Sequence, residues 1–328
     1  MAINTNELAA GVKDYIRDAV PDGLAKATPL WKHLSTDGKE KHDGGLTIQL
    51  PIKLIANTSQ NFISGTGAVT DLTPSQQLVY MTLNWKYYNF NINFTLEDHV
   101  IAKGGDDAIN YFTRKTDGAL GDSFRQLSEA AHGTSTSNAL AFEGMQDIVA
   151  ASGTAYGGLT DTDYDDDAFL PYIPTATVLN YSAINNMIVT LRSRTQGSGV
   201  IDPKKMMGLM NPATYQRFMS ILQNQQVFFD VKDVAESGFD GFRVNGCDFY
   251  MDSDVPGTQD GSTGDNYVYV FMKDVIKLFY KFGLGSDSPF DGDTRPANQP
   301  ITSIQNYLAA NMICTNRRMV AVNKTIIA

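Results

Sequence analysis

The sequence predicts an α+β fold that combines a long β-hairpin, a long helix and a unit of alternating helices and strands. Three observations predict it. Apolar residues alternate with period two over residues 46–54 and again over 81–94, an apolar stripe recurs at helical spacing over 106–132, and short helical and strand patterns alternate from about residue 180. The 328 residues, 42% hydrophobic and 19% charged, suffice for a large folded core.

The first 45 residues indicate a largely extended arm with a helical beginning. Its charges nearly cancel, and Trp31 and Leu34 are expected to anchor it. The charged residues among the first twenty do not resemble a signal peptide, and the longest apolar runs are far shorter than the roughly twenty residues of a membrane span. We therefore expect a protein that is made in a cytosol and has no membrane partner.

Residues 46–95 predict a β-hairpin that cannot bury itself. The first arm alternates apolar with polar residues over Leu46, Ile48, Leu50, Ile52 and Leu54. The second arm alternates likewise and slips by one residue after Tyr87, over Met81, Leu83, Trp85, Tyr87, then Tyr88, Phe90, Ile92 and Phe94. A slip by one residue swaps faces, which indicates a bulge or a strand that moves between two environments. Because an isolated two-stranded ribbon is marginal in water, a partner subunit is a natural support for it.

Four residues of this hairpin are candidate inter-subunit contacts. Phe62 and Ile63 are the main apolar residues of the polar stretch between the arms. Trp85 and Tyr87 lie on the second arm, and large aromatic side chains dominate protein interfaces. Packing within the same chain is an equally weighted alternative for Trp85 and Tyr87.

The next 130 or so residues hold a helix, a loop-rich stretch and the start of the alternating unit. The helix is expected at about 106–132, and loops at 133–178 surround a small apolar island of Phe142, Met145, Ile148 and Val149. Beyond residue 180, Asn180 or Ser182 is expected to cap a helix, 206–210 to form a buried strand, and Asn211-Pro212 to start another helix.

The remaining pattern consists of strands. Asn245-Gly246 predicts a type I′ hairpin over 242–250, and 267–272 with 275–282 predicts a second strand pair. After a Gly- and Pro-rich stretch, strands over 304–326 are expected to pair with the sheet beside the long helix. Arg317 and Arg318 fall in this final strand region, where neighbours face opposite ways. One arginine is a candidate partner for a neighbouring subunit's carboxylate, the other faces solvent or internal DNA, and a plain surface pair is equally plausible.

The sequence carries no recognisable catalytic, cofactor or metal motif, so we predict a protein that is not an enzyme. The four histidines lack zinc or di-iron spacing, and no nucleophile elbow or phosphate-binding loop is present. Asp161, Asp163 and Asp165 mimic the start of a calcium loop, but Asp166 and Tyr172 stand where it needs Gly and Glu, which favours a solvated acidic loop. Cys247 and Cys314 are interpreted as buried thiols.

Charge gives no sign of tight nucleic-acid binding. The net charge is −10, and residues 126–191 contain no Lys or Arg but eight carboxylates, a net −8. Such a surface repels phosphate backbones.

The order of these parts, together with several short stretches, resembles the major capsid protein of a tailed bacteriophage of the Hong Kong 97 type. The stretches are Trp31-x-x-Leu34 followed by Asp43-Gly44-Gly45, Trp85-Lys86-Tyr87-Tyr88 running into Leu96-Glu97-Asp98, Tyr156-Gly157-Gly158, and Cys314-Thr315-Asn316-Arg317-Arg318. The resemblance implies an N-terminal arm (1–45), an extended loop (46–95), a peripheral domain with a spine helix (96–179 and 300–328) and an axial domain (180–299).

The resemblance also implies a function and partners. Such a chain self-assembles into pentamers and hexamers of an icosahedral head that encloses double-stranded DNA, and it becomes part of the virion after assembly in the host cytoplasm. Residues 54–85 contain no lysine for the covalent cross-link of some relatives, so we expect non-covalent locking by overlap of the loop with a neighbour. The short region before Leu46 predicts a separate scaffolding protein, with portal and decoration proteins as further partners. The alternatives are an encapsulin-type nanocompartment shell, another virion structural protein, or an enzyme without a motif.

Overall fold

The computed structural model describes most of the chain. The described residues are 28–42, 45–55, 59, 62, 77–95, 97–98, 105–164, 168–175, 178–194, 202–224, 241–257, 266–282, 293–294 and 301–325. For residues 105–110, 112, 223–224, 293–294 and 325 the description covers the backbone alone.

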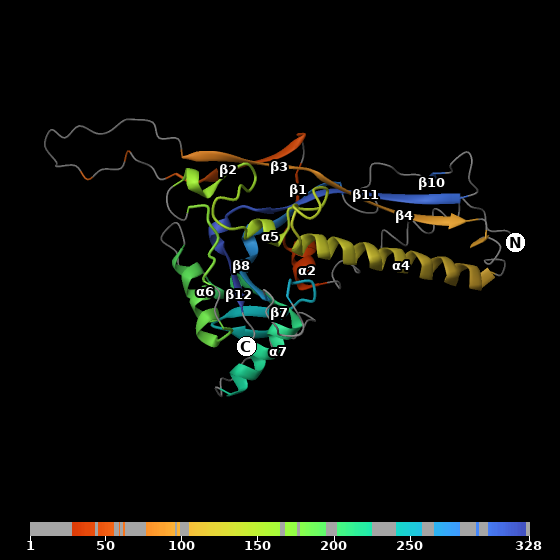
Figure 1. The fold of residues 1–328 in the computed structure, drawn as a ribbon. Coiled ribbons are helices and arrows are strands. Elements are labelled where there is room, and N and C mark those ends of the chain that lie inside the picture. Colours follow the sequence, from red (N-terminus) through yellow and green to blue (C-terminus); the bar gives the residue numbers. More distant parts are fainter. Residues whose placement is uncertain are drawn as a thin grey trace.

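Figure 1 shows a long helix and a long pair of strands at one end of the molecule, and a smaller group of helices and strands at the other. The helices are α2 (Pro29–Thr36), α4 (Gly105–His132), α5 (Met145–Ile148), α6 (Tyr181–Ser193) and α7 (Pro212–Asn224). The first strands are β1 (Lys39–Lys41), β2 (Thr47–Lys53), β3 (Leu78–Asn84), β4 (Lys86–Thr95), β5 (Met206–Met210) and β6 (Gly241–Val244). The later ones are β7 (Cys247–Met251), β8 (Asn266–Met272), β9 (Ile276–Phe282), β10 (Asp293–Thr294), β11 (Ile301–Cys314) and β12 (Val320–Thr325).

The strands form two sheets and a ribbon. The first sheet has the order β1-β9-β11-β10, with β4 also paired to β11, and the second has the order β12-β8-β5-β7-β6. The ribbon consists of β2 and β3. The expected long helix over 106–132 is confirmed as α4, which runs beside β4 and β11 (Figure 1). Its stripe of Leu120, Phe124, Leu127 and Ala131 is buried, as the spacing predicts.

The second arm changes sheet at Trp85, just before the predicted phase slip after Tyr87. β3 pairs with β2 from Leu78 to Asn84, whereas β4 pairs antiparallel with β11 from Lys86 to Thr95. The predicted move between two environments is therefore confirmed. The predicted extent of the hairpin is corrected, because the pairing with β2 ends at Asn84 and β4 belongs to the first sheet.

Several local predictions for the alternating unit are confirmed. α7 begins at Pro212, and the Oδ1 atom of Asn211 accepts a hydrogen bond from the backbone N–H of Thr214 at 2.7 Å. The β6–β7 turn places Asn245 at φ 49° and Gly246 at φ 84°, as a type I′ turn requires. The predicted strand at 206–210 is β5, which is buried along its whole length.

Two expectations about strand pairing are wrong. β8 and β9 do not pair with each other, because the short 3₁₀ helix Lys273–Val275 between them passes the chain from the second sheet to the first. β12 pairs with β8 in the second sheet, so only β11 of the two final strands lies in the sheet beside α4. The two sheets consequently do not divide along the expected bounds of 180–299 and 300–328.

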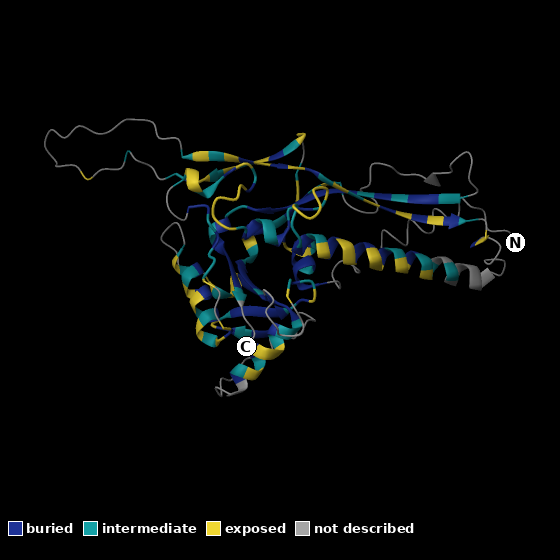
Figure 2. Cartoon of the chain, viewed as in Figure 1, coloured by how far each residue is buried: buried dark blue, intermediate teal, exposed yellow. Residues whose placement is uncertain are grey.

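Figure 2 shows buried residues concentrated in the two sheets and along one side of α4. One core cluster joins α2, the ribbon, the end of α4, the first sheet and one face of the second sheet, and it includes Trp31 and Leu34, so the predicted anchors are buried. The other lies between α6, α7 and the second sheet. Cys247 and Cys314 are buried and free, as predicted. Within the described residues, no helix is long and apolar enough to cross a membrane.

Candidate inter-subunit surfaces

The ribbon β2–β3 has one face against its own chain and one face in solvent. Ile48 and Met81 on the inner face are fully buried. On the outer face, Tyr80 is 63% exposed and lies opposite Pro51, and Leu78 is 50% exposed opposite Lys53. An alternating strand thus presents apolar side chains on both faces, and its own chain covers only one of them.

A turn that contains Gly157 packs against the base of the ribbon. The backbone N–H of Thr82 donates to the carbonyl of Gly157 at 2.8 Å. Gly157 has φ 58°, and a Cβ atom there would lie 2.1 Å from the Cγ atom of Met81. Only glycine lets this turn approach the ribbon so closely, so the base of the ribbon is fixed while its outer face stays open.

Trp85 is a core residue of its own chain. It is 6% exposed, its indole N–H donates to the carbonyl of Gly45 at 3.2 Å, and its ring lies 6.1 Å from that of His42. Of the two interpretations of Trp85, the structure therefore supports packing within the chain, because the residue is part of a buried core cluster at the junction of β3 and β4.

Tyr87, by contrast, faces solvent. It is 69% exposed on β4 and lines an open groove of about 540 Å³ between β4, the end of α4 and the following loop. Leu140, 81% exposed, lines the same groove, whose edge is fixed by a 2.7 Å hydrogen bond from the Nζ atom of Lys86 to the carbonyl of Ala139. Sequence reasoning missed Leu140, since a single leucine in a polar loop carries no periodic signal.

The candidates in the distal part of the hairpin are only partly described. Phe62 is fully exposed. Ile63 lies outside the described residues.

Arg317 is fully buried in its own chain. It begins the 3₁₀ helix Arg317–Met319 between β11 and β12, so the expected position within a strand is corrected. Its Nε atom donates to the carbonyl of Ile148 at 2.8 Å, and its Nη2 atom donates to the carbonyl of Ala150 at 3.1 Å. The guanidinium lies over the neighbouring rings of Tyr156 and Phe169, at 5.4 and 5.2 Å from their centroids.

Burial shifts the pKa values of Arg317 and of the neighbouring Tyr156. It lowers the pKa of the Arg317 guanidinium and raises the pKa of the Tyr156 hydroxyl well above its ordinary value. Arg317 therefore ties the segment after α5 to the connection between the two sheets, and its full burial leaves it no surface for a carboxylate of a neighbouring subunit. Arg318 is half-buried, so it is the one of the two arginines that remains a candidate for a contact with a neighbouring subunit.

The acidic loop holds its first carboxylate by hydrogen bonds. Asp161 accepts from the hydroxyl of Ser152 at 2.5 Å and from the backbone N–H of Gly153 at 2.8 Å, and these bonds lower its pKa against the opposing effect of desolvation. Asp165 and Asp166 lie outside the described residues.

No protein-family model and no curated protein matches the sequence. Solved structures do resemble the chain. The capsid asymmetric unit of cyanophage A-1(L) matches with a TM-score of 0.63 and 11% identity, over 91% of this chain and 92% of that chain. The capsid of the native GTA particle matches with a TM-score of 0.57 and 11% identity, over 90% of each chain. The holo-SrpI encapsulin complex from Synechococcus elongatus matches with a TM-score of 0.54 and 10% identity, over 92% of this chain and 89% of that chain.

The chain therefore has the Hong Kong 97-type fold of phage capsid proteins, as its order of elements predicts. At 10–11% identity, these likenesses define the fold, and the function has to be argued from the surfaces described above.

Proposed function

We propose that this protein is a major capsid protein that assembles into the pentamers and hexamers of an icosahedral phage head. The observation that carries the proposal is the open outer face of the ribbon, which stands on a fold shared with capsid subunits. A ribbon that is fixed at its base and exposes Leu78 and Tyr80 among polar side chains on its outer face suits contact with another copy of the chain.

The outer face offers enough apolar area to matter in assembly. Tyr80 and Leu78 are each at least half exposed, and Leu46 just before the ribbon is 96% exposed. Full burial of one such side chain stabilises a contact by about 1.5–3 kcal/mol. In a closed shell every subunit repeats that contact, so a modest gain for each copy supports a stable particle.

The lock between subunits is non-covalent in this proposal. Residues 54–85 contain no lysine, so this part of the hairpin offers no amine for a cross-link. Overlap and burial of the ribbon on a neighbour then hold the shell together.

Further partners and the location follow from the same proposal. The shell forms in the host cytoplasm on a separate scaffolding protein, includes a portal, accepts decoration proteins and becomes part of the virion. It encloses double-stranded DNA without a specific binding site, which the net charge of −10 supports by disfavouring tight contact with phosphates.

The likeness to an encapsulin shell supports one alternative on the same fold, a bacterial nanocompartment. The two functions differ in what the shell contains. Purified particles with packaged double-stranded DNA support the phage head, and particles that hold a protein cargo without DNA support the nanocompartment.

Substitution on the ribbon tests the proposed contact. We expect Tyr80→Ser to lower the yield of particles in sedimentation assays, because it removes an exposed aromatic ring from the outer face. The free energy of unfolding of the free subunit should change by less than about 0.5 kcal/mol, as at other surface sites.

Gln49→Ser is the matched control, since Gln49 lies exposed on the same face but offers little apolar area. Equal particle yields for the Tyr80 and Gln49 variants would contradict a role of this face in assembly.

A further inference from the structure

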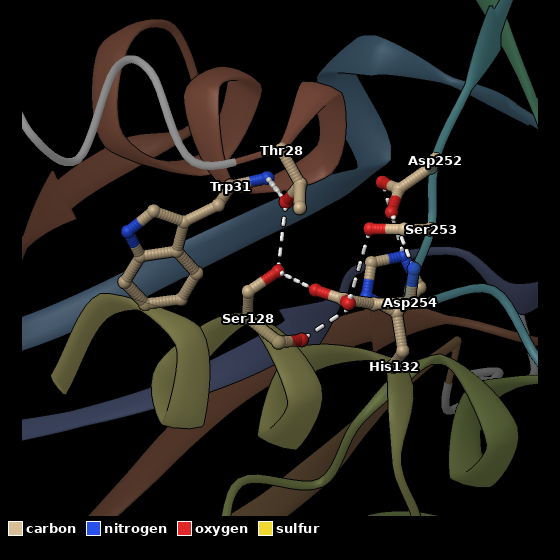
Figure 3. Close-up of polar contacts among 7 residues, drawn as sticks. All are labelled: Thr28, Trp31, Ser128, His132, Asp252, Ser253 and Asp254. Carbon is tan, nitrogen blue, oxygen red and sulfur yellow. Dashed lines mark hydrogen bonds and ion pairs between the residues drawn. The ribbon is translucent and has the colours of Figure 1, made fainter. Parts of the chain in front are cut away.

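A buried cluster of one histidine and two aspartates joins the end of α4 to the second sheet. His132 is the last residue of α4, Asp252 follows β7, and Asp254 lies two residues further along. His132 and Asp252 are each 1% exposed, and Asp254 is partly exposed. Their ligand atoms all lie within 4.8 Å of one another. Figure 3 shows the three side chains converging from the helix and from the loop.

The histidine ring is oriented as in a metal ligand. Its Nδ1 atom lies 3.0 Å from the backbone carbonyl of Ser128. A carbonyl can only accept, so Nδ1 carries the proton and the Nε2 atom is directed at Asp252. A backbone carbonyl that fixes the tautomer in this way is the usual outer partner of a metal-binding histidine.

The distance between Nε2 and the Asp252 carboxylate also fits two ligands of one ion. Nε2 of His132 and Oδ2 of Asp252 are 3.3 Å apart, and neither atom has a hydrogen-bond partner among the described residues. A charge-assisted hydrogen bond is shorter, about 2.7–2.9 Å. Two ligands that each lie about 2.0–2.1 Å from a tetrahedral Zn²⁺ are about 3.3–3.4 Å apart.

The two carboxylates accept hydrogen bonds from α4 and from their own loop, and Thr28 at the start of α2 extends this network. Asp254 accepts a hydrogen bond from the Ser128 hydroxyl at 2.5 Å, and that hydroxyl lies 2.8 Å from the Oγ1 atom of Thr28 (Figure 3). Thr28 in turn caps α2 by accepting from the N–H of Trp31 at 3.3 Å. The Oδ1 atom of Asp252 accepts from the backbone N–H of Asp254 at 3.0 Å, which leaves Oδ2 turned toward His132.

The charges of the cluster favour the binding of a cation. Two carboxylates face one imidazole, and within the described residues His132 is the only basic side chain that pairs with either of them. With a protonated imidazole the buried pair is neutral, and the remaining negative charge lies on the partly exposed Asp254, where a bound cation would offset it.

We propose that His132, Asp252 and Asp254 bind a divalent cation of the Zn²⁺ class. One nitrogen and two carboxylate oxygens match the ligand types that zinc accepts, whereas calcium and magnesium prefer oxygen alone. The three ligand atoms lie within 4.8 Å of one another, and the Asp254 side chain, the partly exposed one of the three, would turn toward the ion to close the ligand set. The ion would pin the end of α4 and the start of α2 to the second sheet, a role independent of the proposed function in a shell.

Zinc binding by the untagged, full-length chain tests the proposal. After treatment with a chelator, the protein is dialysed against Zn²⁺, and the bound metal is measured by mass spectrometry. We expect close to one Zn²⁺ per chain and a higher Tm than for the chelated protein. Asp254→Asn should weaken Zn²⁺ binding at least tenfold, whereas Asp163→Asn in the exposed acidic loop is the matched control and should leave it unchanged.

Cobalt(II) gives a second measurement that does not depend on a variant. Its visible absorption should show the intense bands of a four-coordinate site with nitrogen and oxygen ligands, and Zn²⁺ should abolish them. The absence of stoichiometric Zn²⁺ in the wild-type chain, equal binding by the Asp254 and Asp163 variants, or a weak six-coordinate cobalt spectrum would each overturn the proposal and leave a hydrogen-bonded ion pair.

Discussion

Arg317 should be among the most costly side chains to truncate in the free subunit. Arg317→Met removes a buried hydrogen bond to the Ile148 carbonyl, a partly buried one to the Ala150 carbonyl, and the contact with the rings of Tyr156 and Phe169. Two hydrogen bonds from a charged donor are worth about 1.5–3 kcal/mol each, and a desolvated cation–π contact about 2 kcal/mol. Removal also relieves the cost of burying the charge, which the lowered pKa of Arg317 reflects. We therefore expect the free energy of unfolding to fall by about 3–5 kcal/mol, as for other buried charged contacts.

Urea unfolding of the unassembled subunit, followed by circular dichroism, measures this loss. Arg317→Lys should fall between wild type and Arg317→Met, because an ammonium keeps the charge but cannot reach both carbonyls in the planar arrangement of a guanidinium. Arg318→Met is the matched control at the half-buried neighbouring position. The reasoning is refuted if Arg317→Met lies within about 0.5 kcal/mol of Arg318→Met.

Three further predictions concern the turn under the ribbon, a buried histidine and the hairpin. Gly157→Ala should lower the free energy of unfolding by about 1–3 kcal/mol, because of the positive φ and the contact with Met81. Gly158→Ala is the control: its Cβ would meet open space, so it should lower the free energy of unfolding by less in the same urea assay. Burial lowers the pKa of His33, whose Nε2 atom lies 2.9 Å from the Lys273 carbonyl. As the pH drops below 6.5, the unfolded chain therefore takes up a proton before the folded chain does, and the free energy of unfolding should fall. This slope should flatten in His33→Gln, and equal slopes in the two proteins would contradict it. Deletion of residues 58–75 should leave a folded, soluble subunit by circular dichroism but no closed shells by electron microscopy, and normal shells would show that this segment is dispensable.

Periodicity and turn chemistry predict the local elements of this fold well. The alternation over 46–54 and 81–94 gives β2, β3 and β4, and the slip after Tyr87 indicates a change of sheet that the structure places slightly earlier, at Trp85. Asn211-Pro212 and Asn245-Gly246 fix a helix start and a hairpin turn, since their backbone preferences are strong and local.

The pairing of buried strands could not be predicted in the same way. β8 and β12 are largely buried and β9 is mixed buried and half-buried, so their apolar runs do not show which sheet they enter. The short connection at Lys273–Val275 looks like a hairpin turn in the sequence, yet its 3₁₀ helix leads the chain into the other sheet. The expected strand pair and the expected place of β12 were wrong for this reason.

Surface residues were harder to predict than the fold. An arginine in a polar stretch is typical of a surface, but the two carbonyls that bind Arg317 come from residues 148 and 150, far away in the sequence. Trp85 is apolar and aromatic as an interface anchor would be, and only its contacts with Gly45 and His42, distant in the sequence, show that its own chain covers it. The interface role of Tyr87 and Phe62 stays a prediction that their exposure permits.

Electron microscopy of the purified chain, expressed alone and with its scaffolding protein, tests the central claim most directly. We predict closed icosahedral shells or rings of five or six subunits, with the outer face of β2–β3 covered by an adjoining copy. A monodisperse monomer under both conditions, with that face still open to solvent, would contradict the assignment of this protein as a shell subunit.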